Sequence, residues 1–361
     1  MTDPMKTLDI GRPKPAPVSR KVYAIAGITV TVFGLEELQL EASDVACLWL
    51  LHPRLATQDR MADVAASTII DWNIKSKDNL SSKGLIAVSF DQRNHGPRMV
   101  DPLANEAWRQ GNPRHAQDMF SIYQGTARDT SLLMDYLAAY VFPDGKHEIS
   151  QNLVLGVSLG GHAAWSLLLH EPRMSAGVVI IGAPDFLNVM VDRARLSKLP
   201  SWTRSTPPGS EIIGSEAFPT SFVETVKQYD PAGLFLSHVE GASGLLRIDT
   251  LPEPTEKEKQ ALRPLLTKCL AGKHILNLSG GKDKLVPYHR GEAFLKWLKN
   301  AISSDGWFGD GGVNFEDIID ESAGHEVTRQ MEIEAIRFVS ETLALSADNK
   351  GRRGSVRESK I

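Results

Sequence analysis

The chain has 361 residues, of which 42% are hydrophobic and 23% are charged, and its formal net charge is −4. This composition is typical of a soluble globular protein with one large domain or two ordinary ones. The charge balance gives no support for nucleic-acid binding. We therefore expect a small-molecule partner and no nucleic acid, and the sequence leaves the oligomeric state open.

Cysteine content and hydropathy bear on the cellular compartment. The 2 cysteines are too few for a disulfide framework and favour a reducing compartment. The sequence contains no run of about 18 apolar residues and no apolar signal peptide. We predict a cytoplasmic protein without a membrane span. Because the terminal Ser359-Lys360-Ile361 nearly matches the Ser-Lys-Leu peroxisomal signal, import into peroxisomes is the alternative.

The first half of the chain changes from an irregular segment to alternating strands and helices. Residues 1–20 are predicted to be a flexible arm. From Val45 onward, apolar runs alternate with helical patterns, which indicates a mostly parallel sheet. Strands are expected at residues 22–26, 28–33, 45–51, 85–90 and 153–157, and helices at 61–76, 116–142 and 162–169.

The second half contains a long interruption of this alternation. Residues 185–272 show no strand pattern, and we predict that they form an inserted helical cap, one helix of which begins at Thr255 with Glu258 reaching back to its first turn. Residues 346–361 are predicted to be a disordered basic tail. Further strands are expected at 177–181, 274–278 and 313–319, and further helices at 290–302 and 326–345.

These patterns together predict an α/β fold. The sheet is expected to be mostly parallel and twisted, with helices on both faces. Its core is predicted to comprise residues 21–184 and 273–345.

The segment Gly156-Val157-Ser158-Leu159-Gly160 joins an apolar strand to a helix. A side chain at either glycine would collide with the backbone of a sharp turn, so the sequence predicts that Ser158 is presented at the helix N-terminus. Free amide groups there stabilise the negative charge that arises on a substrate when a nucleophile attacks it, so the position suits a nucleophilic serine. The alternative is a glycine-rich connection between a core strand and a packed helix.

A serine nucleophile needs a base and a carboxylate that orients the base. Asp283 follows a predicted strand and a glycine turn, and His325 follows the last predicted strand. Because the carboxyl ends of parallel strands converge on one crevice, we predict that Ser158, Asp283 and His325 meet there as catalytic residues. Asp185, just past the strand predicted at residues 177–181, is the alternative acid.

The serine elbow, the acid turn Gly280-Gly281-Lys282-Asp283 and the Gly324-His325 loop together resemble the α/β-hydrolase superfamily over residues 22–345. The segments 52–54 (His-Pro-Arg) and 91–96 (Asp-Gln-Arg-Asn-His-Gly) are similar to its intracellular esterase and dienelactone-hydrolase-like or S9-peptidase-like branch.

The resemblance implies an oxyanion hole made of two backbone N–H groups. It assigns one to Leu159, the residue after the nucleophile. The other is expected from the loop after the strand at 45–51, where Pro53 has no N–H group. We assign that donor to Arg54, with Leu55 as the alternative.

Two further sets of residues have competing interpretations. The spacing within 91–96 matches no zinc pattern, and its family counterpart is a structural turn, so we expect Arg93 to pair with buried acceptors. Five apolar side chains of the predicted cap have two interpretations: they line a pocket for the acyl or alcohol group or, as is more common, they pack in the core. They are Phe186, Met190, Trp202, Phe222 and Phe235.

The leading hypothesis is a serine hydrolase that cleaves a carboxylic ester, lactone or thioester through an acyl-enzyme on Ser158, with no metal or organic cofactor. One alternative is an S9-like peptidase or aminopeptidase, although such enzymes usually carry an N-terminal propeller. The other alternative is a non-catalytic protein that binds a small ligand with the same fold.

Overall fold

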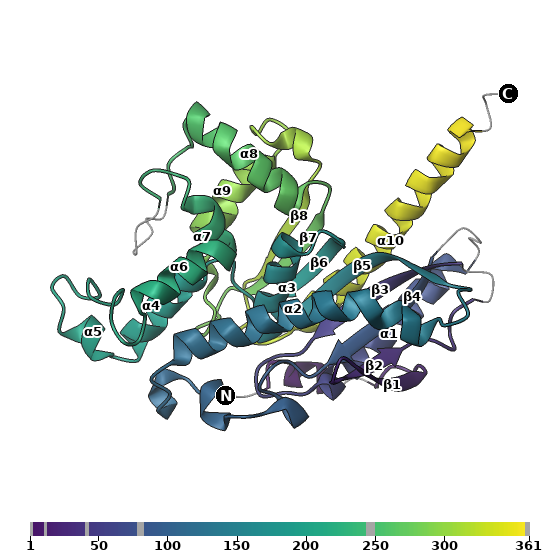
Figure 1. Cartoon of the computed structure of the whole chain (residues 1–361), viewed down its shortest axis with the longest axis horizontal. Helices are drawn as coiled ribbons and strands as arrows, with labels where there is room; N and C mark the ends of the chain where they lie inside the picture. The colour runs from purple at the N-terminus through teal and green to yellow at the C-terminus, as the bar shows by residue number, and fades with distance from the viewer. Residues whose placement is uncertain (1–2, 11–12, 40–42, 78–82, 243–249, 358–361) are drawn as a thin grey trace.

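The computed structural model describes residues 3–10, 13–39, 43–77, 83–242 and 250–357. Within these residues, eight strands form one sheet in the order β1-β2-β4-β3-β5-β6-β7-β8 (Figure 1). The strands β1 and β2 pair antiparallel, as do β2 and β4, whereas all other neighbours are parallel. Their bounds are β1 Arg20–Ile25, β2 Ile28–Phe33, β3 Asp44–Leu51, β4 Gly84–Phe90, β5 Glu148–Val157, β6 Met174–Ile180, β7 His274–Gly280 and β8 Asn314–Asp320.

Helices cover both faces of this sheet, as the sequence predicts. The α-helices are α1 Ala62–Ser76, α2 His115–Val141, α3 Leu159–His170, α4 Phe186–Leu196, α5 Pro200–Thr203, α6 Thr220–Tyr229, α7 Pro231–Leu236, α8 Glu256–Leu270, α9 Glu292–Ile302 and α10 Arg329–Arg357. Short 3₁₀ turns are η1 Lys6–Asp9, η2 Gln58–Met61, η3 Gly96–Arg98, η4 Pro102–Asn105, η5 Trp108–Gln110, η6 Tyr288–Arg290 and η7 Gly309–Gly311.

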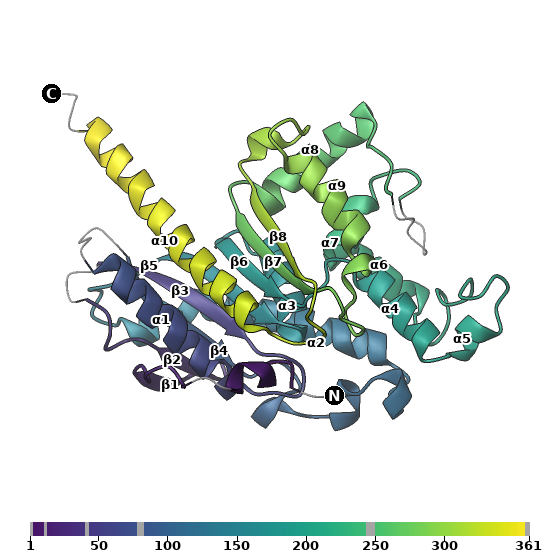
Figure 2. The same cartoon turned by 180° about the vertical axis from the view of Figure 1, so that it is seen from behind.

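The central strand β3 shows why both faces are covered. Successive side chains of a strand point to opposite faces. Cys47, Trp49 and Leu51 join the core under α2, α3, α8 and α9, whereas Leu48 and Leu50 join the core under α1 and α10 (Figure 2). Since neither face meets solvent, the strand is a continuous apolar run, which is the pattern the sequence displays.

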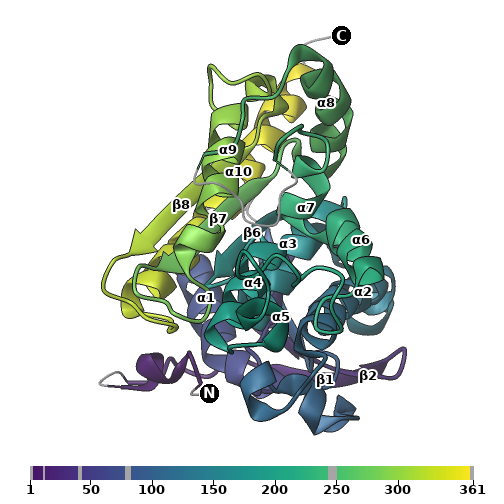
Figure 3. The ribbon, with the colours of Figure 1, turned by 90° about the vertical axis from the view of Figure 1, so that its left-hand side faces the viewer.

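In the described residues, the segment between β6 and β7 consists of helices joined by turns and loops. It contains α4 to α8, and the predicted capping box of Thr255 and Glu258 is confirmed at the start of α8. However, α8 packs against α3, so this last helix belongs to the layer that covers the sheet. Figure 3 views the molecule from the side on which α4 and α5 lie.

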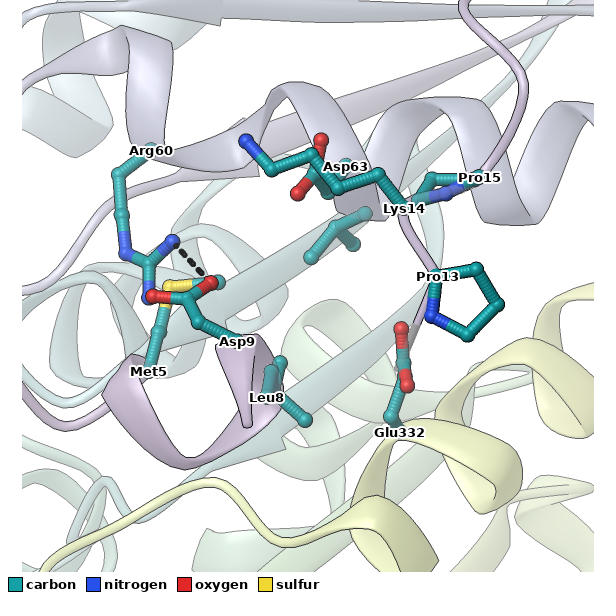
Figure 4. A pocket seen from close by; sticks show the side chains of 10 residues that line it. Met5, Leu8, Asp9, Pro13, Lys14, Pro15, Arg60, Asp63 and Glu332 are labelled. Atoms are coloured by element: carbon teal, nitrogen blue, oxygen red, sulfur yellow. Dashed lines mark hydrogen bonds and ion pairs between the residues drawn. The ribbon is translucent and has the colours of Figure 1, made fainter. Parts of the chain in front are cut away.

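The structure differs from the sequence analysis at the N-terminal arm. Residues 3–10, within the segment expected to be flexible, contain η1, and the side chain of Met5 is buried. Arg60 of η2 donates hydrogen bonds to Asp9, and Figure 4 shows this contact in a pocket that Glu332 of α10 also lines. The apolar Met5 and these charge contacts hold the segment against α1 and α10.

The C-terminal end also differs from the sequence analysis. The predicted disordered tail begins at residue 346, but α10 continues to Arg357 and projects from the body of the molecule (Figures 1 and 2). Extending an existing helix costs far less than starting one, and no proline interrupts residues 346–357. The terminal residues 359–361, considered above as a peroxisomal signal, lie outside the described residues. In the described part of the chain, no helix has the length and apolarity needed to cross a bilayer.

Candidate active site

Ser158 lies at the junction between β5 and α3. Its backbone has φ 55° and ψ −110°, a conformation that is costly for a residue other than glycine and must be held by its surroundings. The N–H group of Ser158 donates to the carbonyl oxygen of Ile180 at 2.9 Å. This bond ties the strained turn to the neighbouring strand β6.

The two glycines that flank Ser158 are required by close backbone contacts. A Cβ atom on Gly156 would lie 2.0 Å from the carbonyl oxygen of Gly160, and one on Gly160 would lie 2.1 Å from that of Leu51. No side chain fits at such distances. The prediction that these positions exclude a side chain is therefore confirmed.

A chain of hydrogen bonds connects Ser158, His325 and Asp283. The Oγ atom of Ser158 is 2.9 Å from Nε2 of His325, and Nδ1 of His325 is 2.7 Å from Oδ2 of Asp283. Since an ionised carboxylate only accepts hydrogen bonds, Nδ1 carries the proton and Nε2 is free to accept the proton of the serine hydroxyl. The structure thus brings together the three side chains that the sequence analysis selected as catalytic.

The carboxylate of Asp283 is held in its ionised form. Burial raises its pKa, but the hydrogen bond and charge of His325, together with the N–H groups of Val286 and Leu285, lower the pKa further and leave it below its ordinary value. Both N–H groups donate to Oδ1, at 2.7 Å from Leu285 and 2.9 Å from Val286. Oδ2 therefore remains available to His325.

Asp185, the alternative acid, has a different place in the structure. Its carboxylate is buried and accepts a hydrogen bond from the N–H group of Asn188 at 3.0 Å. It thereby caps the N-terminus of α4. The structure brings Asp283, rather than Asp185, into contact with His325.

The loop after β3 is fixed by the side chain of His52. Nδ1 of His52 is 2.8 Å from the carbonyl oxygen of Pro53, and Nε2 accepts a hydrogen bond from the N–H group of Gln92 at 3.0 Å. Because C=O and N–H point in opposite directions across a trans peptide bond, the N–H group of Arg54 points away from the His52 ring. The orientation of the peptide group between Pro53 and Arg54 is thus fixed before any ligand binds.

This loop lies directly beside the elbow. The Cα atom of Gly160 packs so closely on the carbonyl groups of Leu51 and His52 that a Cβ atom would be 2.1 and 2.9 Å from their oxygens. The N-terminal amides of α3, including that of Leu159, have no acceptor within their own helix. Leu55, the alternative donor, has φ 65°. The role of Arg54 and Leu159 as oxyanion donors stays a prediction.

The turn at residues 91–96 has a structural role. Arg93 donates to both carboxylate oxygens of the buried Asp129, at 3.0 and 2.8 Å. Asp91 accepts hydrogen bonds from the backbone and the side chain of Gln58, at 2.9 and 3.0 Å. The expectation that Arg93 pairs with a buried acceptor is confirmed.

Comparison with known proteins gives a fold but no sequence family. No protein-family model matches the chain, and no curated protein matches its sequence. The crystal structure of TT1662 from Thermus thermophilus matches with a TM-score of 0.52 at 18% identity, over 91% of this chain and 99% of that one. Together with the strand order and the elbow after β5, this match decides the architecture. The chain has the α/β-hydrolase fold.

Two other matches have lower scores. The Pyrococcus furiosus esterase Pf2001 matches with a TM-score of 0.43 at 12% identity, over 90% of this chain and 93% of that one. The Pyrococcus horikoshii acylaminoacyl peptidase matches with a TM-score of 0.46 at 11% identity, over 93% of this chain. This chain spans only 42% of the peptidase.

Within this α/β-hydrolase fold, a cavity of about 400 Å³ opens beside His325. Its wall comes from the loop before α2, from α4 and from the loop after β7. The lining side chains are Arg54, Glu106, Ala107, Trp108, Arg109, Gln110, His115, Arg193, Leu196, Ser197, Lys284, Leu285 and His325. Apart from Arg54 and His325, the sequence analysis identified none of them, because they have neither a common motif nor a common element.

The apolar cap residues considered as pocket candidates do not line this cavity of the α/β-hydrolase fold. Phe186, Met190 and Phe235 are fully buried in the core. The ring of Phe186 lies 5.0 Å from that of Phe120 on α2. Trp202 and Phe222 pack against the same core, so all five fit the interpretation as packing residues.

Proposed function

We propose that this protein is a serine hydrolase that cleaves a carboxylic ester, lactone or thioester of a small molecule. The observation that carries the proposal is the continuous hydrogen-bond chain from Ser158 through His325 to Asp283, at 2.9 and 2.7 Å. The strained backbone of Ser158 supports it, since strain of this kind is concentrated at functional sites.

The geometry supports a mechanism in two steps. Oγ of Ser158 attacks the carbonyl carbon while Nε2 of His325 takes its proton, and the carboxylate of Asp283 stabilises the imidazolium. The oxyanion accepts hydrogen bonds from the backbone N–H groups of Leu159 and Arg54. His325 then returns the proton to the leaving alcohol or thiol, and water hydrolyses the acyl-enzyme by the same route.

We also propose a cytoplasmic location. Cys47 and Cys269 are both free and buried, which is compatible with a reducing compartment. The alternative signal at Ser359-Lys360-Ile361 is tested by fusing the last dozen residues to a fluorescent reporter. A diffuse signal supports the cytoplasm, whereas a punctate peroxisomal signal contradicts it.

The decisive experiment is the substitution Ser158→Ala. We expect hydrolysis of p-nitrophenyl esters to fall by at least about 10⁴-fold, because the nucleophile is lost while the fold is kept. Ser322→Ala, in an exposed loop, is the matched control and should retain activity. A fluorophosphonate probe should label the unmodified protein and not Ser158→Ala.

Two outcomes would contradict the proposal. Undiminished hydrolysis by Ser158→Ala, with circular dichroism that matches the unmodified protein, would exclude Ser158 as the nucleophile. Absence of labelling and of hydrolysis in the unmodified protein would favour a ligand-binding protein. Comparison of ester, thioester and aminoacyl substrates then decides which bond is cleaved.

A further inference from the structure

The cavity beside His325 has an unusual charge. Among its lining residues, four side chains are cationic and only one is anionic; they are Arg54, Arg109, Arg193 and Lys284, against Glu106. The protein as a whole carries a net charge of −4, so this concentration of positive charge is local. A cavity lined by one sign of charge attracts ligands of the opposite sign.

Arg193 is the most deeply placed of these cations. Only 9% of this residue is exposed. Its guanidinium donates to the carbonyl oxygen of Leu285 at 3.0 and 3.3 Å, to Nε2 of His115 at 3.2 Å and to Sδ of Met119 at 3.0 Å. All of these acceptors are uncharged.

The carboxylate next to Arg193 in the chain has other partners. Asp192 accepts hydrogen bonds from Arg195 and Arg290, both at 2.8 Å. In the described part of the chain, Arg193 forms no salt bridge with a carboxylate. Because buried charges are normally paired, a buried guanidinium that contacts only neutral acceptors indicates a position for an external anion.

The pKa values of the neighbouring groups agree with this interpretation. Burial and then the charge of Arg54 lower the pKa of Arg193 to about 9, against which Asp283 and Asp192 act in the opposite direction. Burial, followed by the charges of Arg193 and Arg54, lowers the pKa of His115 to about 2. His115 is therefore neutral and serves as an acceptor for Arg193. A bound anion would stabilise the charged form of Arg193.

Arg193 is also tied to the residues that hold the catalytic histidine. It donates to the carbonyl group of Leu285, and the N–H group of Leu285 donates to Asp283. Asp283 in turn holds His325, and His325 forms part of the wall of the same cavity. An anion at Arg193 would therefore lie in the cavity that His325 also lines.

We propose that the substrate of this protein carries a carboxylate, which Arg193 and the half-buried Arg54 bind while the ester carbonyl lies at Ser158. The inference rests on the proposed hydrolase function and specifies its substrate class. A guanidinium matches the geometry of a carboxylate. A carboxylate is also a monoanion, so its transfer from water into the cavity costs less free energy than the transfer of a dianion. Lys284 and Arg109, which are exposed on the cavity wall, attract the anion toward the site.

The first test compares esters of matched length. Mono-p-nitrophenyl glutarate carries a terminal carboxylate, and methyl p-nitrophenyl glutarate carries a neutral group of similar shape in its place. We expect kcat/KM to be at least about tenfold higher for the carboxylate, as for a charge-assisted hydrogen bond formed in a desolvated site. An equal or lower kcat/KM for the carboxylate would overturn the inference.

The second test assigns the preference to Arg193. Arg193→Met should reduce the ratio of the two kcat/KM values to about one, and Arg193→Lys should retain part of it. Arg329→Met is the matched control, because it removes the same charge from an exposed side chain on α10, and it should leave the ratio unchanged. A ratio that persists in Arg193→Met would overturn the assignment.

Two additional measurements keep the test decisive if Arg193→Met does not fold, as judged by circular dichroism. Arg54→Met and Lys284→Met alter residues that are less buried, and each should lower the ratio by at least about twofold. A full ratio in both variants would then contradict the inference.

A binding experiment separates this inference from the proposed function. Monomethyl glutarate should bind the Ser158→Ala protein at least about tenfold more tightly than dimethyl glutarate, as measured by calorimetry. If neither p-nitrophenyl ester is hydrolysed but this binding difference is found, the proposed function fails and the carboxylate site stands. If both esters are hydrolysed at equal kcat/KM, the function stands and the carboxylate site fails.

Discussion

Asp283 and Asp185 show how one residue type takes two roles according to its contacts. Each follows a strand at the carboxyl edge of the sheet, and each is buried. Asp283 has one oxygen occupied by two backbone N–H groups and offers the other to His325. The carboxylate of Asp185 instead caps α4. Spacing along the chain left both as candidates, and only their hydrogen bonds distinguish them.

This difference leads to a prediction for the two aspartates. Asp283→Asn should lower kcat by about 10⁴-fold, since the amide favours the wrong tautomer of His325. Asp185→Asn should retain kcat within about tenfold, because asparagine caps a helix nearly as well as aspartate. Initial rates with a p-nitrophenyl ester measure both. A larger loss for Asp185→Asn would identify Asp185 as the acid.

Arg54 has separate backbone and side-chain functions in our proposals. Arg54→Pro removes the N–H group and should lower kcat on the neutral ester by about 10²- to 10³-fold, as for loss of one oxyanion donor. Arg54→Ala keeps the N–H group, so its kcat on the neutral ester should exceed that of Arg54→Pro by at least about tenfold. Equal rates in the two variants would move the donor to another residue, such as Leu55.

At the scale of elements, the turn between β5 and α3 depends on the absence of side chains. Gly160→Ala places a Cβ atom 2.1 Å from the carbonyl oxygen of Leu51. We expect the free energy of unfolding to fall by about 3 kcal/mol, because rigid backbone must move to relieve the contact. Chemical denaturation monitored by circular dichroism measures the change.

The control for this prediction is Gly324→Ala. The nearest heavy atom to its Cβ would be 3.9 Å away, so the free energy of unfolding should change by no more than about 0.5 kcal/mol. If both variants were equally stable, the close approach of the elbow to β3 would be contradicted.

The terminal elements were harder to predict than the central ones. The segment around η1 has a composition that suggests a loop, but Met5 finds a place in the core against α1 and α10. No pattern in the local sequence predicts this contact of Met5 with helices that are distant in the chain. The end of α10 likewise depends on whether a docked helix continues, because residues 346–357 contain no proline and the helix passes Gly351 and Gly354.

At the scale of the whole molecule, several histidines are buried in the neutral form. Burial is the largest cause that lowers the pKa of His52 and His162 to about 3 and that of His115 to about 2. In the unfolded chain these histidines have a pKa of about 6.5. Below that pH, the unfolded chain therefore binds protons that the folded protein does not bind at these sites.

It follows that stability decreases as the pH falls from about 6.5 toward the folded pKa values. Each of the three histidines should contribute up to about 1.4 kcal/mol per pH unit to this loss, and the contribution vanishes above the unfolded pKa. Chemical denaturation between pH 7 and pH 5 measures the slope. His162→Gln should reduce the slope by about one proton. An unchanged slope in His162→Gln would contradict the prediction.

The sequence by itself determined the central strands and helices and the positions of the polar side chains at their ends. Apolar runs such as β3 specify a strand buried on both faces, and the two glycines around Ser158 specify a turn that excludes side chains. These signals are local, so each can be recognised within a few residues. They were sufficient to select Ser158, Asp283 and His325, although 167 positions separate Ser158 from His325, because parallel strands end at one edge.

Only the tertiary structure decided which side chains surround those three residues. Arg193, His115 and Leu285 come from α4, from α2 and from the loop after β7, and no spacing rule relates them. Their meeting depends on how the helices after β6 pack over the edge of the sheet. Burial then makes the charge of Arg193 significant, because the same side chain in water would have solvent as its partner.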